Sequence, residues 1–414
     1  MSERQPWALP GDRQPVIIAA RRTPICRAHG ALKSVPAHGL LAPVLRELLT
    51  ELRSGDGVPP VSVTDVVIGN AVGGGGNVAR LAALEAGLPV SVPGLTVDRQ
   101  CGSGLDAIVL ASRLVAAGGD GLYLAGGVES ISTAPMRARR DTDGVPAFFA
   151  RAQFSPLALG DPDMGVAAEN VATRCGISRE RQDGFALRSH RRALASAAAG
   201  FFDAEIVPLR GGPGSDGPPV VSADDGAGLV SADDGPRRGL TGAVLARFPP
   251  VFAAGGTVTA GNSCFDADGA AAVVITTVER ARALGARDGL LVRGTDTAGV
   301  DPQLLGIGAA AAAERLLERC GMTAAELGLV EFNEAFASQT LACLDRLGIP
   351  AERANLDGGA LALGHAYGAS GAVLVTRLLA QARRSPVAGQ LALAMISIAG
   401  GMGTAALLEY QILS

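Results

Sequence analysis

The sequence is poor in several residue types, and each shortage excludes a class of function. Lysine occurs once, as Lys33, and the net charge of −4 includes no basic block, which argues against nucleic acid as a partner. The six cysteines are scattered without paired spacing, so the pattern indicates neither a disulfide framework nor a zinc site. The first residues are polar and lack the apolar stretch of a signal peptide.

Long apolar runs are also scarce. The uncharged stretch at residues 391–408 could be mistaken for a membrane helix, but its centre reads Gly-Gly-Met-Gly, which would break a helix. A strand, a tight turn and a second strand fit this stretch better. We therefore expect a soluble, cytoplasmic protein without a membrane partner.

What is present is enough apolar material for more than one core. The chain has 414 residues, of which 48% are hydrophobic and 18% charged, so two domains or two halves are expected. Short strand-like runs alternate with longer helical patterns, which predicts an α/β fold. The predicted strands span 15–20, 65–70, 121–127 and 270–277, and the predicted helices span 37–53 and 103–117.

The same theme restarts near residue 288, with a strand pattern, a helix near 309–320 and a helix that ends near 382. GLYLAGGVES in the first half parallels LALAMISIAGG in the second, which suggests a duplicated unit. We divide the chain into an N-terminal half, 1–285, and a C-terminal half, 286–414. Residues 128–250 are richer in Arg, Asp, Pro and Gly, and we interpret them as an inserted loop domain.

Cys101 is the first candidate for chemistry. In VDRQCGSGL it follows a strand-like stretch and precedes small residues that allow a sharp turn into a helix. The free N–H groups and positive dipole at a helix N-terminus favour a thiolate. A buried inert cysteine is the alternative for this stretch taken alone.

Two further motifs accompany this cysteine. His365 lies in the glycine-rich bend NLDGGALALGHAYGASG, whereas His29, His38 and His190 lie in ordinary loop or surface contexts. A histidine can activate a cysteine by taking its thiol proton. EFNEAFA places Asn333 and Glu334 at the end of an apolar strand, where they could hold a water or orient a ligand.

Together these motifs resemble the thiolase family. VDRQCGSGL, GTVTAGNSCFDADGAAA, EFNEAFA, NLDGGALALGHAYGASG and AGGMG occur in the family's order and spacing, and the likeness runs from about residue 14 to 412. The resemblance implies the α/β thiolase fold: two duplicated halves that form a five-layer αβαβα sandwich with an inserted loop domain. It also implies a homodimer or a homotetramer.

The resemblance further implies an acyl-CoA C-acyltransferase that makes or cleaves 3-oxoacyl-CoA by Claisen or retro-Claisen chemistry. Cys101 would become acylated, His365 would take its proton, and Asn333 would hold a water beside His365 in one oxyanion hole. The backbone N–H groups of Cys101 and Ala399 would form the second oxyanion hole. CoA would be substrate and product, and the chemistry would need no metal or redox cofactor. The residues implied for substrate or CoA binding are Met164, Ala260, Cys264, Ala335 and Phe336.

The sequence departs from the family pattern in its last motif. A second catalytic cysteine, which moves the α-proton of the substrate, belongs where this chain has Ser397. A thiol titrates near 8.5, within reach of neutral pH, whereas a serine hydroxyl needs its own base. Ala399 also replaces a glycine, Asp163 stands where many members have a histidine, and Cys264 stands where a serine is common.

These departures leave three hypotheses. The first is thiolase chemistry, and the second is acyl transfer from Cys101 to a nucleophile that needs less activation. The third is a non-catalytic subunit that binds acyl-CoA or a partner enzyme. Retention of Cys101, His365 and Asn333 on three separate loops argues against the third.

Overall fold

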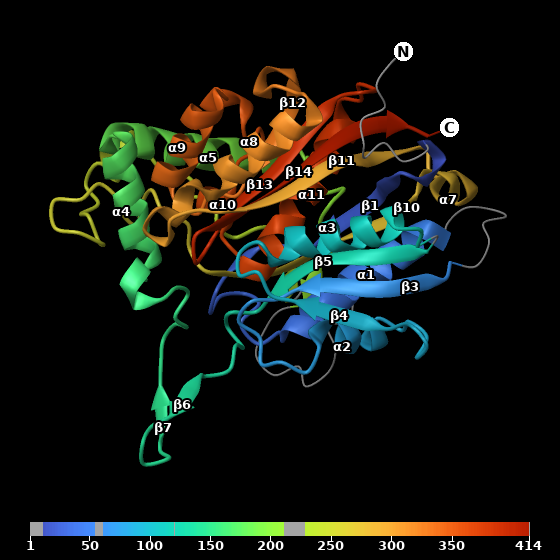
Figure 1. Ribbon diagram of the computed structural model, residues 1–414, viewed down its shortest axis with the longest axis horizontal. Helices are drawn as coiled ribbons and strands as arrows, with labels where there is room; N and C mark the ends of the chain where they lie inside the picture. The colour runs from blue at the N-terminus through green and yellow to red at the C-terminus, as the bar shows by residue number, and fades with distance from the viewer. Residues whose placement is uncertain (1–10, 54–60, 120, 211–227, 414) are drawn as a thin grey trace.

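The computed structural model describes residues 11–53, 61–119, 121–210 and 228–413. At its centre is a ten-stranded mixed sheet with the order β12-β13-β14-β11-β1-β10-β5-β3-β4, with β2 paired to β10 (Figure 1). Its strands are β1 (Pro15–Arg22), β2 (Cys26–Arg27), β3 (Val63–Gly69), β4 (Gly94–Val97), β5 (Leu122–Glu129), β10 (Ala267–Thr277), β11 (Asp288–Gly299), β12 (Leu327–Phe332), β13 (Leu391–Ile398) and β14 (Met402–Ile412).

The pairing pattern of the first half of the sheet is repeated in the second. β3 runs parallel to β5. β5 then pairs antiparallel with β10, and β10 pairs antiparallel with β1. In the same way β12 runs parallel to β13, and the series β13-β14-β11 is antiparallel. The likeness between GLYLAGGVES and LALAMISIAGG therefore reflects equivalent strands, β5 and β13.

The two halves of the sheet meet where β1 pairs with β11, through Val16 with Leu291 and Ile17 with Leu290. Helices cover the outer face of each half, and another pair lies between the halves, so the layers run helix, sheet, helix, sheet, helix (Figure 1). The outer helices are α1 (Ala37–Arg53) and α2 (Val78–Glu85) on one side and α8 (Gly308–Cys320) and α9 (Ala337–Leu347) on the other; the central pair is α3 (Ser103–Ala116) and α11 (Tyr367–Arg384).

This layering follows from strands that are apolar on both faces. Val66 faces the core under α1 and α2, whereas its neighbour Val67 faces the core around α3 and α11. In the second half Ala394 faces the central core and Met395 faces the core under α8 and α9. Successive strand residues point to opposite faces, so a continuous apolar run is what a doubly covered strand requires.

Several predicted elements are confirmed with small shifts at their ends. The helix expected at 103–117 is α3, and the uncharged stretch at 391–408 forms the hairpin of β13 and β14. Gly400 and Gly401 both have φ of 82° at its turn, a left-handed conformation that glycine adopts readily. No helix in the described ranges is long and apolar enough to cross a membrane.

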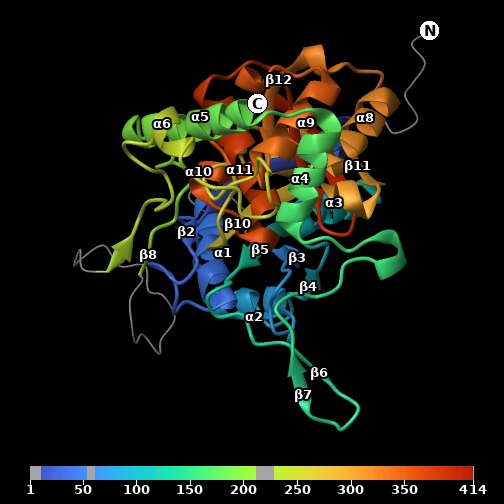
Figure 2. The same cartoon turned by 90° about the vertical axis from the view of Figure 1, so that its left-hand side faces the viewer.

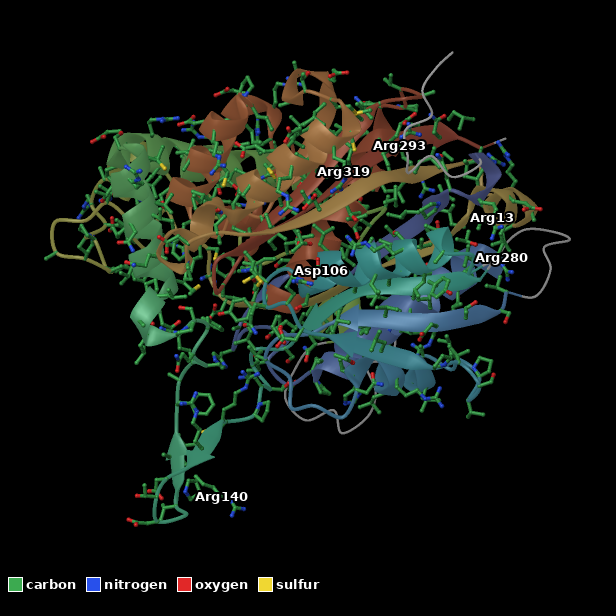
Figure 3. The ribbon with its side chains drawn as sticks, viewed as in Figure 1. Arg13, Asp106, Arg140, Arg280, Arg293 and Arg319 are labelled. Atoms are coloured by element: carbon green, nitrogen blue, oxygen red, sulfur yellow. The ribbon has the colours of Figure 1, made fainter. Side chains whose placement is uncertain are left out.

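The excursion from the first half occupies residues 130–266, between β5 and β10, so it continues beyond the expected end near 250. Its last residues, among them Ser263, Cys264 and Asp266, form a loop. A hairpin of β6 and β7 projects from the body of the molecule (Figure 2), and Arg140 lies on it (Figure 3). Residues 211–227 of the predicted loop domain lie outside the described ranges. The remaining elements are β6 (Ala138–Arg140), β7 (Pro146–Phe148), α4 (Met164–Cys175), α5 (Arg179–Ala198), β8 (Leu209–Arg210), β9 (Leu229–Val230), α6 (Gly242–Leu245), α7 (Val278–Ala283) and α10 (Ala360–Leu363).

The central helices approach each other closely because glycine lies at their contact. A Cβ added at Gly104 of α3 would lie 2.5 Å from the carbonyl oxygen of Gly368 in α11. Asp106 of α3 (Figure 3) also accepts a 2.9 Å hydrogen bond from the Thr404 hydroxyl, which ties the helix to β14 of the other half. The N-termini of α3 and α11 are thus brought together.

Candidate active site

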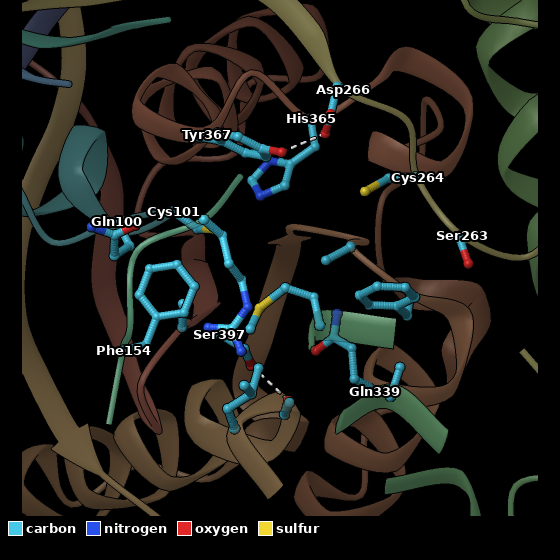
Figure 4. A pocket seen from close by; sticks show the side chains of 18 of the residues that line it. Gln100, Cys101, Phe154, Ser263, Cys264, Asp266, Gln339, His365, Tyr367 and Ser397 are labelled. Atoms are coloured by element: carbon cyan, nitrogen blue, oxygen red, sulfur yellow. Dashed lines mark hydrogen bonds between the residues drawn. The ribbon is translucent and has the colours of Figure 1, made fainter. Parts of the chain in front are cut away.

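A cavity of about 380 Å³ lies where the N-termini of α3 and α11 meet the loops of both halves (Figure 4). In this view His365 and Ser397 lie on opposite sides of the cavity. The predicted site residues that line it are Cys101, Met164, Cys264, Ala335, Phe336, His365, Ser397 and Ala399. The tertiary structure therefore gathers into one cavity motifs that are up to about three hundred residues apart in the chain.

The turn that presents Cys101 depends on the residues before it. Gln100 has φ of 47°, an uncommon left-handed conformation for a residue with a side chain. The Asp98 carboxylate accepts a 2.7 Å bond from the Gln100 N–H, and the Ser103 hydroxyl donates to the Gln100 carbonyl at 2.6 Å. Gln100 therefore makes the sharp turn that was expected at the small residues after Cys101.

The thiol of Cys101 is the resting form, which corrects the expectation of a favoured thiolate. Burial raises its pKa to about 12, and the carboxylates of Glu129 and Asp266 contribute to the rise. The backbone N–H groups of Cys101 and Ala399 both point at the sulfur and lower the pKa, but they do not offset burial. These two N–H groups are the pair that the resemblance implied for an oxyanion hole.

His365 lines the same cavity as this cysteine and is held there by two hydrogen bonds. The backbone N–H of His365 donates to the Phe265 carbonyl at 2.9 Å, and the ring Nδ1 lies 2.6 Å from the Ser370 hydroxyl. Burial lowers the pKa of the imidazole to about 4, so the ring is neutral at neutral pH. Its Nε2 atom is buried and has no hydrogen-bond partner within the described part of the chain.

Cys101 is therefore a neutral thiol and His365 a neutral imidazole in the resting protein. Burial penalises the charged form of both groups, so a thiolate–imidazolium pair is disfavoured before substrate binds. A carbonyl carbon at the sulfur would change this balance, because its oxygen would take up the negative charge near the N–H groups of Cys101 and Ala399. Proton transfer to Nε2 can then accompany bond formation at the sulfur.

Ser397 reaches the cavity from the end of β13. Its hydroxyl donates to the Gly306 carbonyl at 2.7 Å and accepts from the Ala309 N–H at 3.1 Å (Figure 4). The serine is therefore oriented by two backbone groups at the start of α8.

Two predicted site residues are not among those that line this cavity. Asn333 is buried and faces a separate cavity of about 20 Å³, and its Nδ2 has no partner among the described residues. Ala260 lines another small cavity beside His190 and Phe265. Glu334, which was considered with Asn333, accepts bonds from Ser189 and Asn355 and is structural.

The cavity also contains polar residues that sequence reasoning missed. The Tyr367 hydroxyl donates to Asp266 at 2.5 Å, and both residues lie inside motifs that had been singled out for their neighbours. Arg151 pairs with Asp161 at 3.0 Å and with Asp163 at 2.7 Å, which holds the segment before Met164 against the cavity. Arg151 is in the inserted region, where no periodic pattern marks it.

Comparison with protein families matches this chain along most of its length. Residues 15–279 match the thiolase N-terminal domain, and residues 290–410 match the thiolase C-terminal domain.

Individual proteins give the same result. The chain is 43% identical over 395 residues to YhfS of Bacillus subtilis, a protein named as an acetyl-CoA C-acetyltransferase, covering 95% of this chain and 98% of that protein. It is 43% identical over 405 residues to VraB of Staphylococcus haemolyticus, which carries the same activity name, with 96% and 99% covered. The crystal structure of an acetyl-CoA acetyltransferase from Bacillus anthracis superposes with a TM-score of 0.83 at 34% identity, covering 96% of this chain and 98% of that one.

The fold, the gathered motifs and these matches agree along nearly the whole chain. The protein belongs to the thiolase family and is an acyl-CoA C-acyltransferase of the thiolase type.

Proposed function

We propose that Cys101 accepts the acyl group of an acyl-CoA thioester and that His365 takes up the thiol proton. The observation that carries this assignment is the convergence on one sulfur of the N–H groups of Cys101 and Ala399, with the free Nε2 of His365 in the same cavity. Backbone donors aimed at a developing oxyanion are worth about 3 to 4 kcal/mol each.

In the first half-reaction the sulfur attacks the thioester or ketone carbonyl while its proton passes to His365 Nε2. When the donor is a 3-oxoacyl-CoA, the bond between the carbonyl carbon and the α-carbon breaks, and the electron pair stays on the α-carbon. We assign the protonation of that carbanion to Ser397, which lies across the cavity from His365 (Figure 4). In the second half-reaction the CoA thiol gives its proton to the Ser397 oxygen as it attacks acyl-Cys101, and the sulfur of Cys101 recovers its proton from His365.

We further propose that Asn333 acts through a water, as the resemblance implies. The support is its buried Nδ2, which has no protein partner in the described residues and faces a space of about 20 Å³. A space of that size holds one water molecule. Met164, Cys264, Ala335 and Phe336 line the cavity and would contact the acyl or pantetheine groups. Ala260 stays a proposed contact outside that lining.

This chemistry needs a nucleophile, an acid–base pair and oxyanion donors, so we propose a reaction without a metal or redox cofactor. We also propose a cytoplasmic homo-oligomer, a dimer or a tetramer, without nucleic acid as a partner. The projecting hairpin supports self-association, because Val145 and Phe148 on it are exposed (Figure 2). Light scattering after size-exclusion chromatography measures the oligomeric state.

The decisive experiment is intact-mass analysis after incubation with acyl-CoA thioesters of several chain lengths. We expect a covalent acyl adduct on the wild-type protein and none on Cys101→Ala. Absence of an adduct at every chain length would overturn the catalytic assignment and favour a binding role.

Cleavage of acetoacetyl-CoA and longer 3-oxoacyl-CoA substrates tests the second step. An adduct from acetyl-CoA without cleavage of any of these substrates would indicate acyl transfer to a different nucleophile.

A further inference from the structure

A thiol that has no role in the proposed acyl transfer lies near Ser397. Cys343 on α9 is fully buried and does not line the cavity. Its sulfur lies 3.3 Å from the Gly306 carbonyl oxygen, the same oxygen that accepts the Ser397 hydroxyl at 2.7 Å. The Ser397 hydroxyl is also near enough to lower the pKa of the Cys343 thiol. The two side chains thus form a contiguous hydroxyl–thiol pair that leads away from the cavity.

Both atoms of this pair face the N-terminus of α8. The Ala309 N–H donates to the Ser397 oxygen at 3.1 Å, and the Ala310 N–H points to the Cys343 sulfur. The first N–H groups of a helix have no acceptor within the helix and stabilise negative charge. A negative charge formed on either the oxygen or the sulfur would be stabilised by the same helix.

We propose that Cys343 is the proton reservoir of this active site, a positioning residue that supplies and recovers protons through Ser397. The proposal rests on the assignment of Ser397 as the group that faces the α-carbon of the substrate. It gives the Ser397 oxygen a neighbouring group that can replace the proton donated to the substrate.

The protons balance over one cycle of cleavage. Ser397 gives its hydroxyl proton to the α-carbanion, and its oxygen takes the thiol proton of Cys343, which leaves a thiolate at the Ala310 N–H. When CoA attacks acyl-Cys101, the CoA thiol proton passes through Ser397 back to Cys343. The proton taken from Cys101 by His365 returns to Cys101 as its sulfur leaves. The net result moves one proton from CoA to the new methyl or methylene group.

The environment of Cys343 keeps its thiol protonated before the substrate reacts. Burial raises the pKa of Cys343 to about 12, while the Ala310 N–H and the Ser397 hydroxyl lower it. The thiol therefore holds its proton until Ser397 draws it, and the resulting thiolate is basic enough to recover a proton from the CoA thiol.

Cys343→Ala tests the proposal, with Cys320→Ala as a matched control. Cys320 is also a buried cysteine of the core under α8 and α9, and it lies at the far end of α8 from Ser397. In Cys343→Ala we expect kcat for acetoacetyl-CoA cleavage to fall roughly a hundredfold with KM unchanged, because general acid–base catalysis is lost. Acylation of Cys101 by acetyl-CoA involves no α-proton and should keep its wild-type rate. Cys320→Ala should keep both rates.

Rescue distinguishes a proton store from a packing residue. In the double variant Cys343→Ala with Ser397→Cys, a thiol faces the substrate directly, so cleavage should return to the level of Ser397→Cys alone. Equal cleavage by Cys343→Ala and Cys320→Ala, or no rescue in the double variant, would overturn the proposal. If Cys343→Ala does not fold, Cys343→Ser keeps a donor to Gly306 without an acidic proton and should show the same loss. If the wild-type protein forms no acyl adduct on Cys101, the result instead contradicts the proposed function itself.

Discussion

Cys101 and His365 occupy equivalent positions in the two halves of the molecule. Cys101 lies two residues before α3 begins at Ser103, and His365 lies two residues before α11 begins at Tyr367. α3 leads to β5 and α11 leads to β13, the equivalent strands of the repeated pairing pattern. The duplication therefore provides two helix N-termini that face one cavity, one preceded by Cys101 and the other by His365.

The neutral state of this pair predicts how Cys101 reacts with iodoacetamide as pH changes. Its thiol pKa is raised to about 12, so the thiolate fraction should rise roughly tenfold per pH unit from about pH 6 to about pH 9. Mass spectrometry of the peptide that contains Cys101 measures the rate without interference from the exposed Cys175. A plateau near neutral pH would show a thiolate–imidazolium pair and contradict the neutral assignment.

Ser370→Ala should impair catalysis without weakening substrate binding. It removes the hydroxyl 2.6 Å from His365 Nδ1, the contact that orients the ring in its buried pocket. A hydrogen bond of about 1.4 kcal/mol corresponds to a tenfold change in rate, so kcat should fall about tenfold while KM stays the same. Steady-state kinetics decides this, and Ser370→Thr, which keeps a hydroxyl, should retain more of the rate. If Ser370→Ala has the wild-type kcat, the Ser370 hydroxyl does not orient His365 for catalysis.

Ser397→Cys should raise the rate of thiolysis, because a thiol transfers protons near neutral pH without help from a second group. We expect roughly a hundredfold gain in kcat with acetoacetyl-CoA and no change in Cys101 acylation by acetyl-CoA. Ser397→Ala should lower the same kcat below the wild-type value. If Ser397→Cys leaves thiolysis unchanged, position 397 does not limit proton transfer in this protein.

Gly104→Ala should lower both stability and activity. The added Cβ would meet the Gly368 carbonyl at 2.5 Å, so α3 and α11 have to separate. Strain of this kind costs about 1 to 3 kcal/mol, and the separation also moves the turns that hold Cys101 and His365. Thermal denaturation and thiolysis measure the two effects.

Gly184→Ala is the matched control, since that glycine lies inside α5 with no atom within 4 Å of an added Cβ. It should stabilise the protein by up to about 1 kcal/mol and leave activity unchanged. Equal behaviour of the two variants would show that the contact between α3 and α11 does not require glycine.

The elements with strong apolar patterns were predictable, whereas the site was predictable only as separate pieces. The helix at 37–53 and the hairpin of β13 and β14 match expectation, because a local apolar period marks the helix and a glycine turn marks the hairpin. Arg151 and Tyr367 were not found, because a polar residue in an irregular segment has no period that marks its contacts. The expected thiolate at Cys101 was wrong, because a helix N-terminus is visible in sequence and the depth of burial is not.

The sequence by itself predicted the α/β class and the thiolase family, and it marked Cys101, His365 and Ser397 as candidate site residues. These predictions depend on residue types and on their order in short motifs, which are visible in the sequence. The tertiary structure alone decided that Cys101 and His365 are neutral, that Ser397 is bound to Gly306 and Ala309, and that Cys343 lies behind it. Burial and long-range contacts set these properties, and both arise only when distant segments pack together.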